Sequence, residues 1–186
     1  QINYEKINNY ELVILDHLSD LTASIKQQLY QFTQNNGNLL IFLQEFSNID
    51  DYNIFFKQLN IDFLSKWIDK KQTIESINYD NDIFQSVFKQ KNKNINLPIV
   101  NNYFQITPNK KSQKRNILSL INNNPFLAEY KYNKGRVFVC FSDLNMQNNS
   151  FAEHALFVPF LYNSALINLK NRPLYHILQN ETIIER

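Results

Sequence analysis

The stretch that decides the predicted fold is Tyr10-Glu11-Leu12-Val13-Ile14-Leu15-Asp16, a short and nearly continuous apolar run that ends in a carboxylate. Such a run is typical of a strand that is buried on both faces of a sheet. A second run of the same kind, Asn38-Leu39-Leu40-Ile41-Phe42-Leu43, follows in the same quarter of the chain. The two runs predict two core strands.

An amphipathic helix is predicted between these strands. Apolar residues recur there at spacings of three and four and form one stripe, made of Leu18, Leu21, Ile25, Leu29 and Phe32. Ser19 or Asp20 could cap the start of the helix, and we expect Gly37 to end it in the left-handed conformation. Strand, helix and strand make a βαβ unit, in which the strands run parallel. The unit therefore predicts an open α/β sheet.

The composition limits what the chain can be. Its 186 residues are 44% hydrophobic and 19% charged, which gives enough apolar surface for one folded domain. The net charge of +2 is too balanced for a protein that binds nucleic acid. The single cysteine excludes an internal disulfide and a thiolate zinc cluster. No apolar run approaches the roughly 20 residues that cross a bilayer.

We expect residues 1–186 to form a single domain, with residues 45–115 as an elaborated insertion into the sheet fold. Within the insertion, Asp50 to Leu59 predicts a helix with its aromatic residues inward, and Ile61 to Trp67 continues or follows that helix. Thr73 to Tyr79 alternates weakly, like an edge strand, and Leu97 to Thr107 reads as extended chain.

The last third of the chain predicts an antiparallel hairpin and a final helix. Residues 126–131 and 136–141 read as strands around the turn at residues 132–135, so the sheet should be mixed. Proline cannot lie deep in a helix, so we expect a short turn after Ser150 and then a helix with Pro159 in its first turn. The face of this helix that packs on the sheet is expected to hold Val158, Leu161, Tyr162, Ala165, Leu166 and Leu169.

Cys140 is the single thiol available as a nucleophile, and it lies in the apolar run of residues 137–141. Burial in that run should raise its pKa and keep it protonated, so we interpret it as structural. Ser142 and Asp143 follow at the carboxyl edge, where open α/β sheets bind ligands. No glycine flanks Ser142, so the Gly-x-Ser-x-Gly elbow is missing and a turn or cap role is preferred.

Asp16 and His17 follow the first strand at the same expected edge, and together they could orient a water molecule or hold a metal. In the plainer interpretation, Asp16 and Ser19 cap the next helix and His17 lies in solvent. His154 and His176 show no metal-binding spacing. We therefore assign no catalytic, cofactor-binding or metal-binding residue.

Two further groups of side chains could form binding surfaces. The basic group is interpreted as a solvated loop rather than a phosphate site, and it consists of Lys110, Lys111, Lys114 and Arg115. The aromatic group could contact a protein partner or a carbohydrate, although aromatic residues at such spacings belong to the core more often. Its members are Tyr52, Phe55, Phe56, Trp67, Tyr103 and Phe104.

Several short motifs, in this order along nearly the whole chain, look like a known family region: residues 10–16, 36–41, 82–88, 97–100, 116–120, 134–137 and 155–159. The chain resembles the glutamine-amidotransferase-like domain of BatA-type aerotolerance membrane proteins of Gram-negative bacteria. This resemblance implies an open, mostly parallel, flavodoxin-like sheet with an antiparallel hairpin edge and helices on both faces. It also implies that the chain, which begins with Gln1, belongs to a longer membrane-anchored protein and lies on the periplasmic side.

Active glutamine amidotransferases carry a cysteine on an elbow between a strand and a helix, with a later histidine and glutamate to activate it. Residues 44–47 follow the second predicted strand without a cysteine, and Cys140 lies within a strand, so no catalytic residue carries over. We expect a noncatalytic protein-interaction or sensing domain with partners in the cell envelope, no cofactor and no nucleic acid. The alternative is a hydrolase or small-ligand enzyme that uses Asp16, His17, Ser142 and Asp143.

Overall fold

The computed structural model describes residues 4–85, 87–88, 95–170, 175–178 and 181–184. Its main sheet contains β1 (Leu12–Leu15), β2 (Asn38–Phe42), β3 (Phe63–Ile77), β4 (Ile99–Thr107), β5 (Lys114–Leu120), β6 (Pro125–Tyr132) and β7 (Gly135–Cys140). The helices are η1 (Tyr4–Asn9), which is a 3-10 helix, α1 (Ala23–Gln34), α2 (Ile49–Gln58) and α3 (Phe157–Lys170). A separate hairpin of β8 (Tyr175–Leu178) and β9 (Glu181–Ile184) follows.

The predicted βαβ unit is confirmed. β1 and β2 run parallel, with Leu12 opposite Asn38. The signals at the ends of α1 differ from those expected, because Thr22 caps the helix and Asn36 takes the left-handed conformation, with φ of 75°. Gly37 is needed for a different reason: a Cβ atom there would overlap the ring of Phe32.

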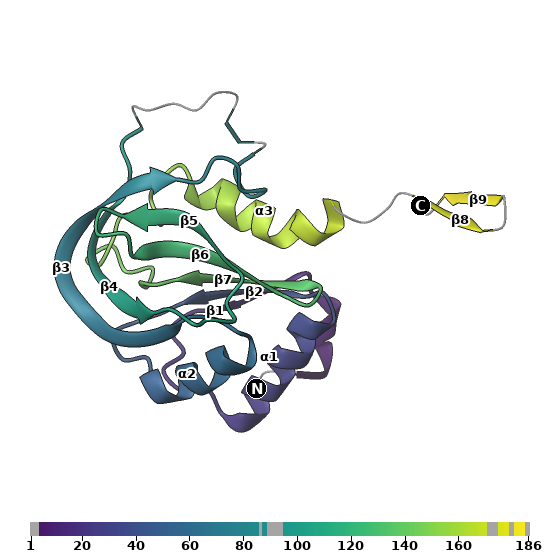
Figure 1. Ribbon diagram of the computed structural model, residues 1–186, viewed down its shortest axis with the longest axis horizontal. Coiled ribbons are helices and arrows are strands. Elements are labelled where there is room, and N and C mark those ends of the chain that lie inside the picture. The colour runs from purple at the N-terminus through teal and green to yellow at the C-terminus, as the bar shows by residue number, and fades with distance from the viewer. Residues whose placement is uncertain (1–3, 86, 89–94, 171–174, 179–180, 185–186) are drawn as a thin grey trace.

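The prediction of a mostly parallel, flavodoxin-like sheet is wrong. The strand order is β1-β2-β7-β6-β5-β3-β4, and only the β1–β2 and β2–β7 pairs of this sheet are parallel. The pairs from β7 through β6, β5 and β3 to β4 are all antiparallel. The result is a mixed sheet, with α3 on one face and α1 and α2 on the other (Figure 1).

β3 accounts for much of this difference. It is a 15-residue strand that pairs with β4 through its first part and with β5 through its last part. The sequence suggested a helix extension over residues 61–67 and a weak edge strand over residues 73–79. Exposed charged side chains such as Lys66 and Lys70, together with shifts of register at Leu64/Lys66 and Asp69/Gln72, hide the period of two that marks a strand.

β1 was expected in the core, but it forms one edge of the sheet. Its residues are only partly buried, and Ile14 is 46% exposed. β2, in contrast, is buried at every position, as predicted for residues 38–43. Both strands are apolar runs, and such a run alone does not tell an edge strand from a central one.

Each face of the sheet has its own apolar core, and β7 contributes to both by alternation. Phe138 and Cys140 lie in the core beneath α3, whereas Val137 and Val139 lie in the core beneath α1 and α2. The second core also receives the aromatic residues of α2, whose inward orientation is confirmed. The predicted antiparallel hairpin of β6 and β7 is confirmed as well.

α3 begins as predicted, with Pro159 in its first turn. The predicted buried face is confirmed at Leu161, which is partly buried and packs against the core, but it is wrong at Val158 and Tyr162. Val158 and Tyr162 are 71% and 65% exposed. The residues buried against the sheet are Phe160, Asn163, Ser164, Ile167 and Asn168. The side chain of Leu169, which was also expected on the buried face, lies outside the described residues.

Gly135 lets α1 approach the start of β7, which gives a first prediction. A Cβ atom at Gly135 would overlap the carbonyl oxygens of Thr33 and Gly37. Gly135→Ala should therefore lower the free energy of unfolding by about 1–3 kcal/mol, measured by urea denaturation. The control is Lys134→Ala, at the exposed neighbouring position, which should change it by less than about 0.5 kcal/mol. Equal stabilities of the two variants would contradict this packing.

Candidate functional site

The residues expected at the carboxyl edge lie at one edge of the sheet but do not form a catalytic set. β1 and β7 are parallel and β2 lies between them, so Asp16, His17, Ser142 and Asp143 all follow strand ends at the same edge. Among the described residues, no hydrogen bond or ion pair joins the Asp16–His17 pair to Ser142 or Asp143.

Ser142 has a structural role. Its buried hydroxyl donates a hydrogen bond to the carbonyl oxygen of Asn102 at 2.8 Å and accepts one from the side-chain amide of Asn149 at 3.0 Å. Since both bonding capacities of the hydroxyl are engaged, Ser142 ties the end of β7 to β4 and to the following loop. A structural role was expected for Ser142, but the hydroxyl links a strand and a loop and forms neither a turn nor a helix cap.

Asp143 organises the same loop. Its carboxylate accepts hydrogen bonds from the backbone N–H of Asn145 at 3.0 Å and from the side-chain amide of Asn148 at 2.7 Å. Such a local pattern is typical of an Asx turn. The loop formed in this way reaches β4, where the N–H groups of Asn101 and Asn102 both donate to the carbonyl oxygen of Asn148.

The pair Asp16 and His17 is exposed. The two side chains contact one another, with His17 Nδ1 3.1 Å from the carboxylate of Asp16, and 64% of the His17 side chain is open to solvent. His17 has a φ of 53° and forms part of the turn between β1 and α1. The predicted solvent position of His17 is confirmed, but Thr22 caps α1 instead of Asp16.

Cys140 is fully buried among apolar side chains, and burial raises the pKa of its thiol well above the ordinary value. A thiol that stays protonated is a poor nucleophile. The structural interpretation of Cys140 is therefore confirmed.

A thiol reagent tests the burial of Cys140. In the folded protein at pH 8 we expect its reaction with a colorimetric disulfide reagent to be at least about 100-fold slower than in denaturant, because the core must open first. The absorbance of the released thiolate follows the reaction. Rapid reaction in the folded state would show an accessible, activated thiol and would contradict the structural role.

The other two predicted surfaces are also engaged in the fold. Lys114 forms an ion pair with the buried carboxylate of Asp62 at 2.6 Å, and Arg115 forms one with Glu129 at 2.8 Å, so half of the basic group is neutralised. The aromatic group is not a surface, since all its members except the partly buried Trp67 are buried in the two cores. Trp67 packs against Phe104 with ring centroids 5.0 Å apart.

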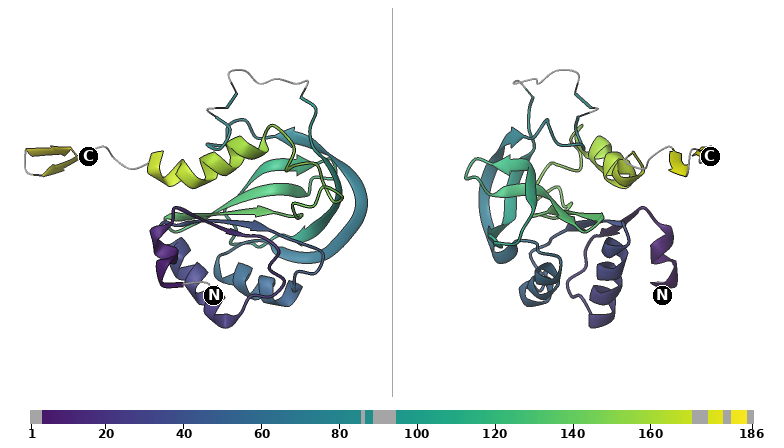
Figure 2. Two further views of the ribbon diagram at one scale, coloured as in Figure 1. Left: turned by 180° about the vertical axis from the view of Figure 1, so that it is seen from behind. Right: turned by 45° about the vertical axis from the view of Figure 1, so that its right-hand side comes forward.

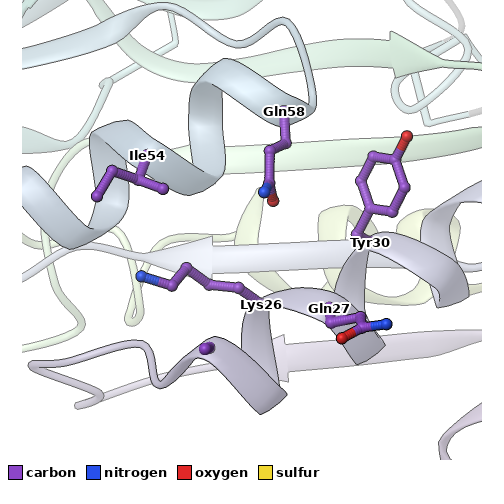
Figure 3. Close-up of a pocket in the computed structure, with 6 residues that line it drawn as sticks. Lys26, Gln27, Tyr30, Ile54 and Gln58 are labelled. Carbon is purple, nitrogen blue, oxygen red and sulfur yellow. The ribbon is translucent and has the colours of Figure 1, made fainter.

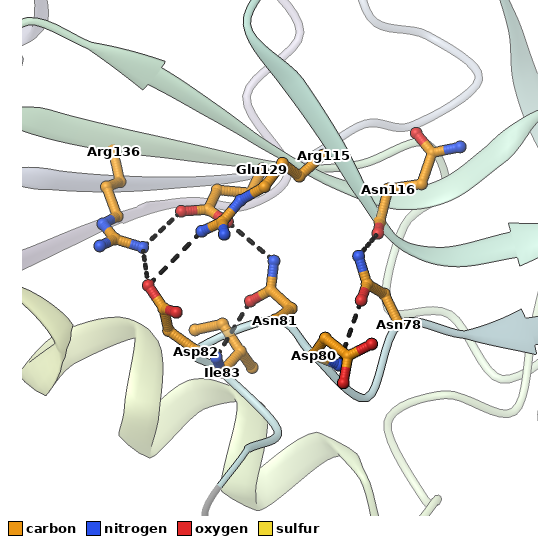
Figure 4. Close-up of polar contacts among 9 residues, drawn as sticks. All are labelled: Asn78, Asp80, Asn81, Asp82, Ile83, Arg115, Asn116, Glu129 and Arg136. Atoms are coloured by element: carbon orange, nitrogen blue, oxygen red, sulfur yellow. Dashed lines mark hydrogen bonds and ion pairs between the residues drawn. The ribbon is translucent and has the colours of Figure 1, made fainter.

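The sequence did not reveal the buried charged cluster that surrounds Glu129 on β6 (Figure 4). Its fully buried carboxylate accepts hydrogen bonds from Arg136 at 2.6 Å, from Arg115 at 2.8 Å and from Asn81 at 2.8 Å. Asp82 contacts both arginines, at 3.0 Å and 3.5 Å. One signal was present in the sequence, namely a glutamate within the apolar run of residues 125–130.

The cluster is electrically balanced, with two arginines and two carboxylates. Burial alone would raise the pKa of Asp82, but its hydrogen bond and charge contacts with Arg136, and its contact with Arg115, lower it below the ordinary value. The cluster joins three neighbouring strands to the loop that contains Asn81. We therefore assign it a structural role.

Removal of the central carboxylate tests this role. Glu129→Ala should lower the free energy of unfolding by about 3–5 kcal/mol, because it leaves the nearly buried Arg136 without its closest partner. Urea denaturation measures the change. Lys131→Ala, at an exposed position of the same strand, serves as the control and should cost less than about 0.5 kcal/mol. A loss below about 1 kcal/mol for Glu129→Ala would contradict the structural role.

A groove of about 630 Å³ lies between α1 and α2 and is lined by Ala23, Lys26, Gln27, Tyr30, Ile54 and Gln58 (Figure 3). The ammonium group of Lys26 is paired with the carboxylate of Asp51 at 2.9 Å. The hydroxyl of Tyr30 accepts hydrogen bonds from Tyr132 and Gln34. The ammonium group of Lys26 and the hydroxyl of Tyr30 are thus already engaged within the protein.

The exposed side of α3 is apolar, and we call Val158, Tyr162, Ala165 and Leu166 the α3 outer face. The first two are exposed and the last two are partly buried. The polar residues of α3 face the sheet instead: the side-chain amide of Asn163 donates to the carbonyl oxygen of Ile83 at 2.8 Å, and that of Asn168 donates to the carbonyl oxygen of Asn36 at 2.7 Å. α3 therefore buries two asparagine amides together with the apolar side chains of Phe160 and Ile167, and it exposes apolar side chains where a surface helix normally carries charged ones.

Comparison with known proteins identifies structures of the same fold. No protein-family model and no curated protein sequence matches this chain. Two cytoplasmic proteins of Salmonella typhimurium superpose with TM-scores of 0.65 and 0.64 at 13% identity, over 89% and 88% of this chain and 74% of each of theirs. A β-galactosidase from Rahnella sp. R3 superposes with a TM-score of 0.62 at 13% identity, over 91% of this chain and 24% of the enzyme. Identities this low show a shared fold alone.

One prediction is corrected by these neighbours. The Salmonella proteins are described as cytoplasmic, whereas the family resemblance implied a membrane-anchored domain on the periplasmic side. That localisation is therefore withdrawn. Within the described residues, no helix combines the length and the hydropathy that a bilayer span requires. The resemblance to BatA-type proteins is tested by none of these comparisons and stays a prediction.

Proposed function

We propose that this chain is a noncatalytic protein-interaction domain and that the α3 outer face is its contact surface. The observation that carries the proposal is the apolar outer side of α3: Val158 and Tyr162 face solvent, although the helix already buries Phe160 and Ile167 against the sheet. Single exposed apolar residues are common on protein surfaces and mean little. Here they recur at the helical spacing of residues 158, 162 and 165, which makes a continuous stripe.

The composition of α3 supports a contact surface. Solvent-facing helices normally carry lysine or glutamate on the exposed side, but residues 157–169 contain no charged residue. Apolar surface costs free energy in water, and burial recovers about 25 cal/mol for each Å² that is covered. A tyrosine at the centre of such a stripe is a residue type enriched at interfaces, because it combines a large apolar ring with a polar tip.

The contacts of the other candidate residues support the proposal that the domain is noncatalytic. Ser142 and Asp143 are held in structural hydrogen bonds, Cys140 is buried and protonated, and His17 contacts only Asp16 among the charged groups of the described residues. A general base must reach the group that it activates, and no such pair is present among these four residues.

Photocrosslinking from defined positions tests the contact surface. A benzophenone amino acid placed at Val158 should give a discrete crosslinked product in cells, whereas the same group at Ile54, which is 53% exposed on α2, should not. Val158→Asp should weaken the purified complex at least about 10-fold, because it would bury an unpaired charge, and Ile54→Asp should leave it unchanged. Mass spectrometry identifies the crosslinked partner, and isothermal titration measures its affinity.

Two outcomes would overturn the proposal. The first is the same set of products from both crosslinking positions, or unchanged affinity of the Val158→Asp variant. The second is catalysis: ester or amide hydrolysis by the purified protein that disappears in Ser142→Ala or Cys140→Ala would show an active site.

A further inference from the structure

The two edges of the sheet are protected to different degrees. β4 forms one edge, and its backbone is covered by the segment that follows β7. The N–H of Phe104 donates to the carbonyl oxygen of Phe141 at 2.7 Å, and that of Asn101 donates to Asn148 at 2.6 Å. β1 forms the other edge, and no described segment is hydrogen-bonded along its free side. The sheet thus has one covered edge and one open edge.

The pairing of β1 with β2 determines which of its backbone groups are free. In a parallel pair, alternate residues of a strand bond to the same neighbour. The carbonyl oxygen of Glu11 accepts from the N–H of Asn38 at 3.0 Å, so Glu11, Val13 and Leu15 bond toward β2. The N–H and carbonyl groups of Leu12 and Ile14 consequently point away from the sheet.

β1 is short, at four residues, but it lacks the other features by which natural proteins protect an open edge. Charged residues, prolines and bulges usually prevent edge-to-edge pairing. β1 consists of Leu-Val-Ile-Leu, has no shift of register against β2 and exposes 46% of Ile14. An apolar cavity of about 360 Å³ extends along the same strand, between η1, β1 and α1. The left panel of Figure 2 shows the molecule from behind, with the purple N-terminal segment on the near side.

We propose that β1 pairs with β1 of a second copy of this chain and joins the two sheets into one. The pairing is antiparallel about a two-fold axis at Val13, as an interface between identical surfaces requires. Leu12 of each copy then lies opposite Ile14 of the other. Both residues present free backbone groups, so this register makes four hydrogen bonds and leaves none of the free groups of β1 unpaired. The edge is therefore complementary to itself.

No two carboxylates lie directly opposite one another in this register. Glu11 and Asp16 flank the strand, and like charges directly opposite one another would oppose pairing. In the proposed register, Glu11 lies opposite Leu15 and Asp16 lies opposite Tyr10, so the carboxylates of the two copies are not paired with one another. Tyr10 is 59% exposed, and its ring is available for this contact.

Sedimentation equilibrium of the purified chain tests the proposal without any other protein, so it succeeds or fails independently of the α3 outer face. We expect a dimer with a Kd of about 1–100 µM, since the contact is short. Ile14→Lys should raise the Kd at least about 10-fold, because a charged edge residue blocks pairing. Ile54→Lys introduces the same charge at a similarly exposed position and should leave the Kd unchanged. Circular dichroism confirms that both variants are folded.

A disulfide measures the register directly. In a Cys140→Ala background, Val13→Cys places two thiols across the two-fold axis, where Cβ atoms of opposite residues are about 4.5–5.5 Å apart, and mild oxidation should give a covalent dimer. Ile54→Cys in the same background should give none. A monomer at all concentrations, a dimer that Ile14→Lys leaves intact, or binding of an unrelated extended peptide by a monomeric chain would each overturn the proposal.

Discussion

Three buried asparagines, together with the packing of Phe160 and Ile167, hold one side of α3 against the sheet. Asn163 bonds to the backbone of Ile83, Asn168 bonds to Asn36 and to the side chain of Asn38, and Asn38 donates in turn to the carbonyl oxygen of Ser164. A buried amide without a partner costs several kcal/mol, so rotation of α3 that broke these bonds would be strongly unfavourable. The exposure of Val158 and Tyr162 follows from these bonds and from the packing of Phe160 and Ile167 on the same side of the helix.

The sequence could not have revealed this orientation. The rule that apolar residues face inward selected Val158 and Tyr162, because it takes no account of the partners that a buried polar residue needs. Those partners lie at residues 36, 38 and 83, up to 132 positions away in the chain. The rule gave the correct result for β2, which is buried throughout, and for α2, which directs Tyr52, Phe55 and Phe56 into the core. The buried side chains of α2 and of residues 39–42 are all aliphatic or aromatic, so none of them opposes the apolar pattern. Cys140 was placed correctly for the same reason.

The sheet was predictable only in part, also for a physical reason. The βαβ unit and the β6–β7 hairpin depend on contacts near in sequence, and both were recognised. β3 pairs with two different strands through shifted registers, so its side chains do not keep a regular alternation. Glu129 lies within an apolar strand because Arg115 and Arg136 neutralise it from the strands on either side. Such clusters depend on which strands are neighbours in the sheet, and a short stretch of sequence does not indicate the strand order.

The orientation of α3 can be measured by the reactivity of single cysteines. In a Cys140→Ala background, cysteine is placed in turn at Val158, Tyr162, Phe160 and Ile167, and its labelling by a maleimide is followed in the native protein by mass spectrometry. We expect the first two positions to react at the rate of an unfolded control, and the last two to be protected at least about 100-fold, as buried core positions are. Rapid labelling at Phe160 and Ile167 with protection at Val158 and Tyr162 would show that α3 packs on the sheet through the α3 outer face and would contradict the account.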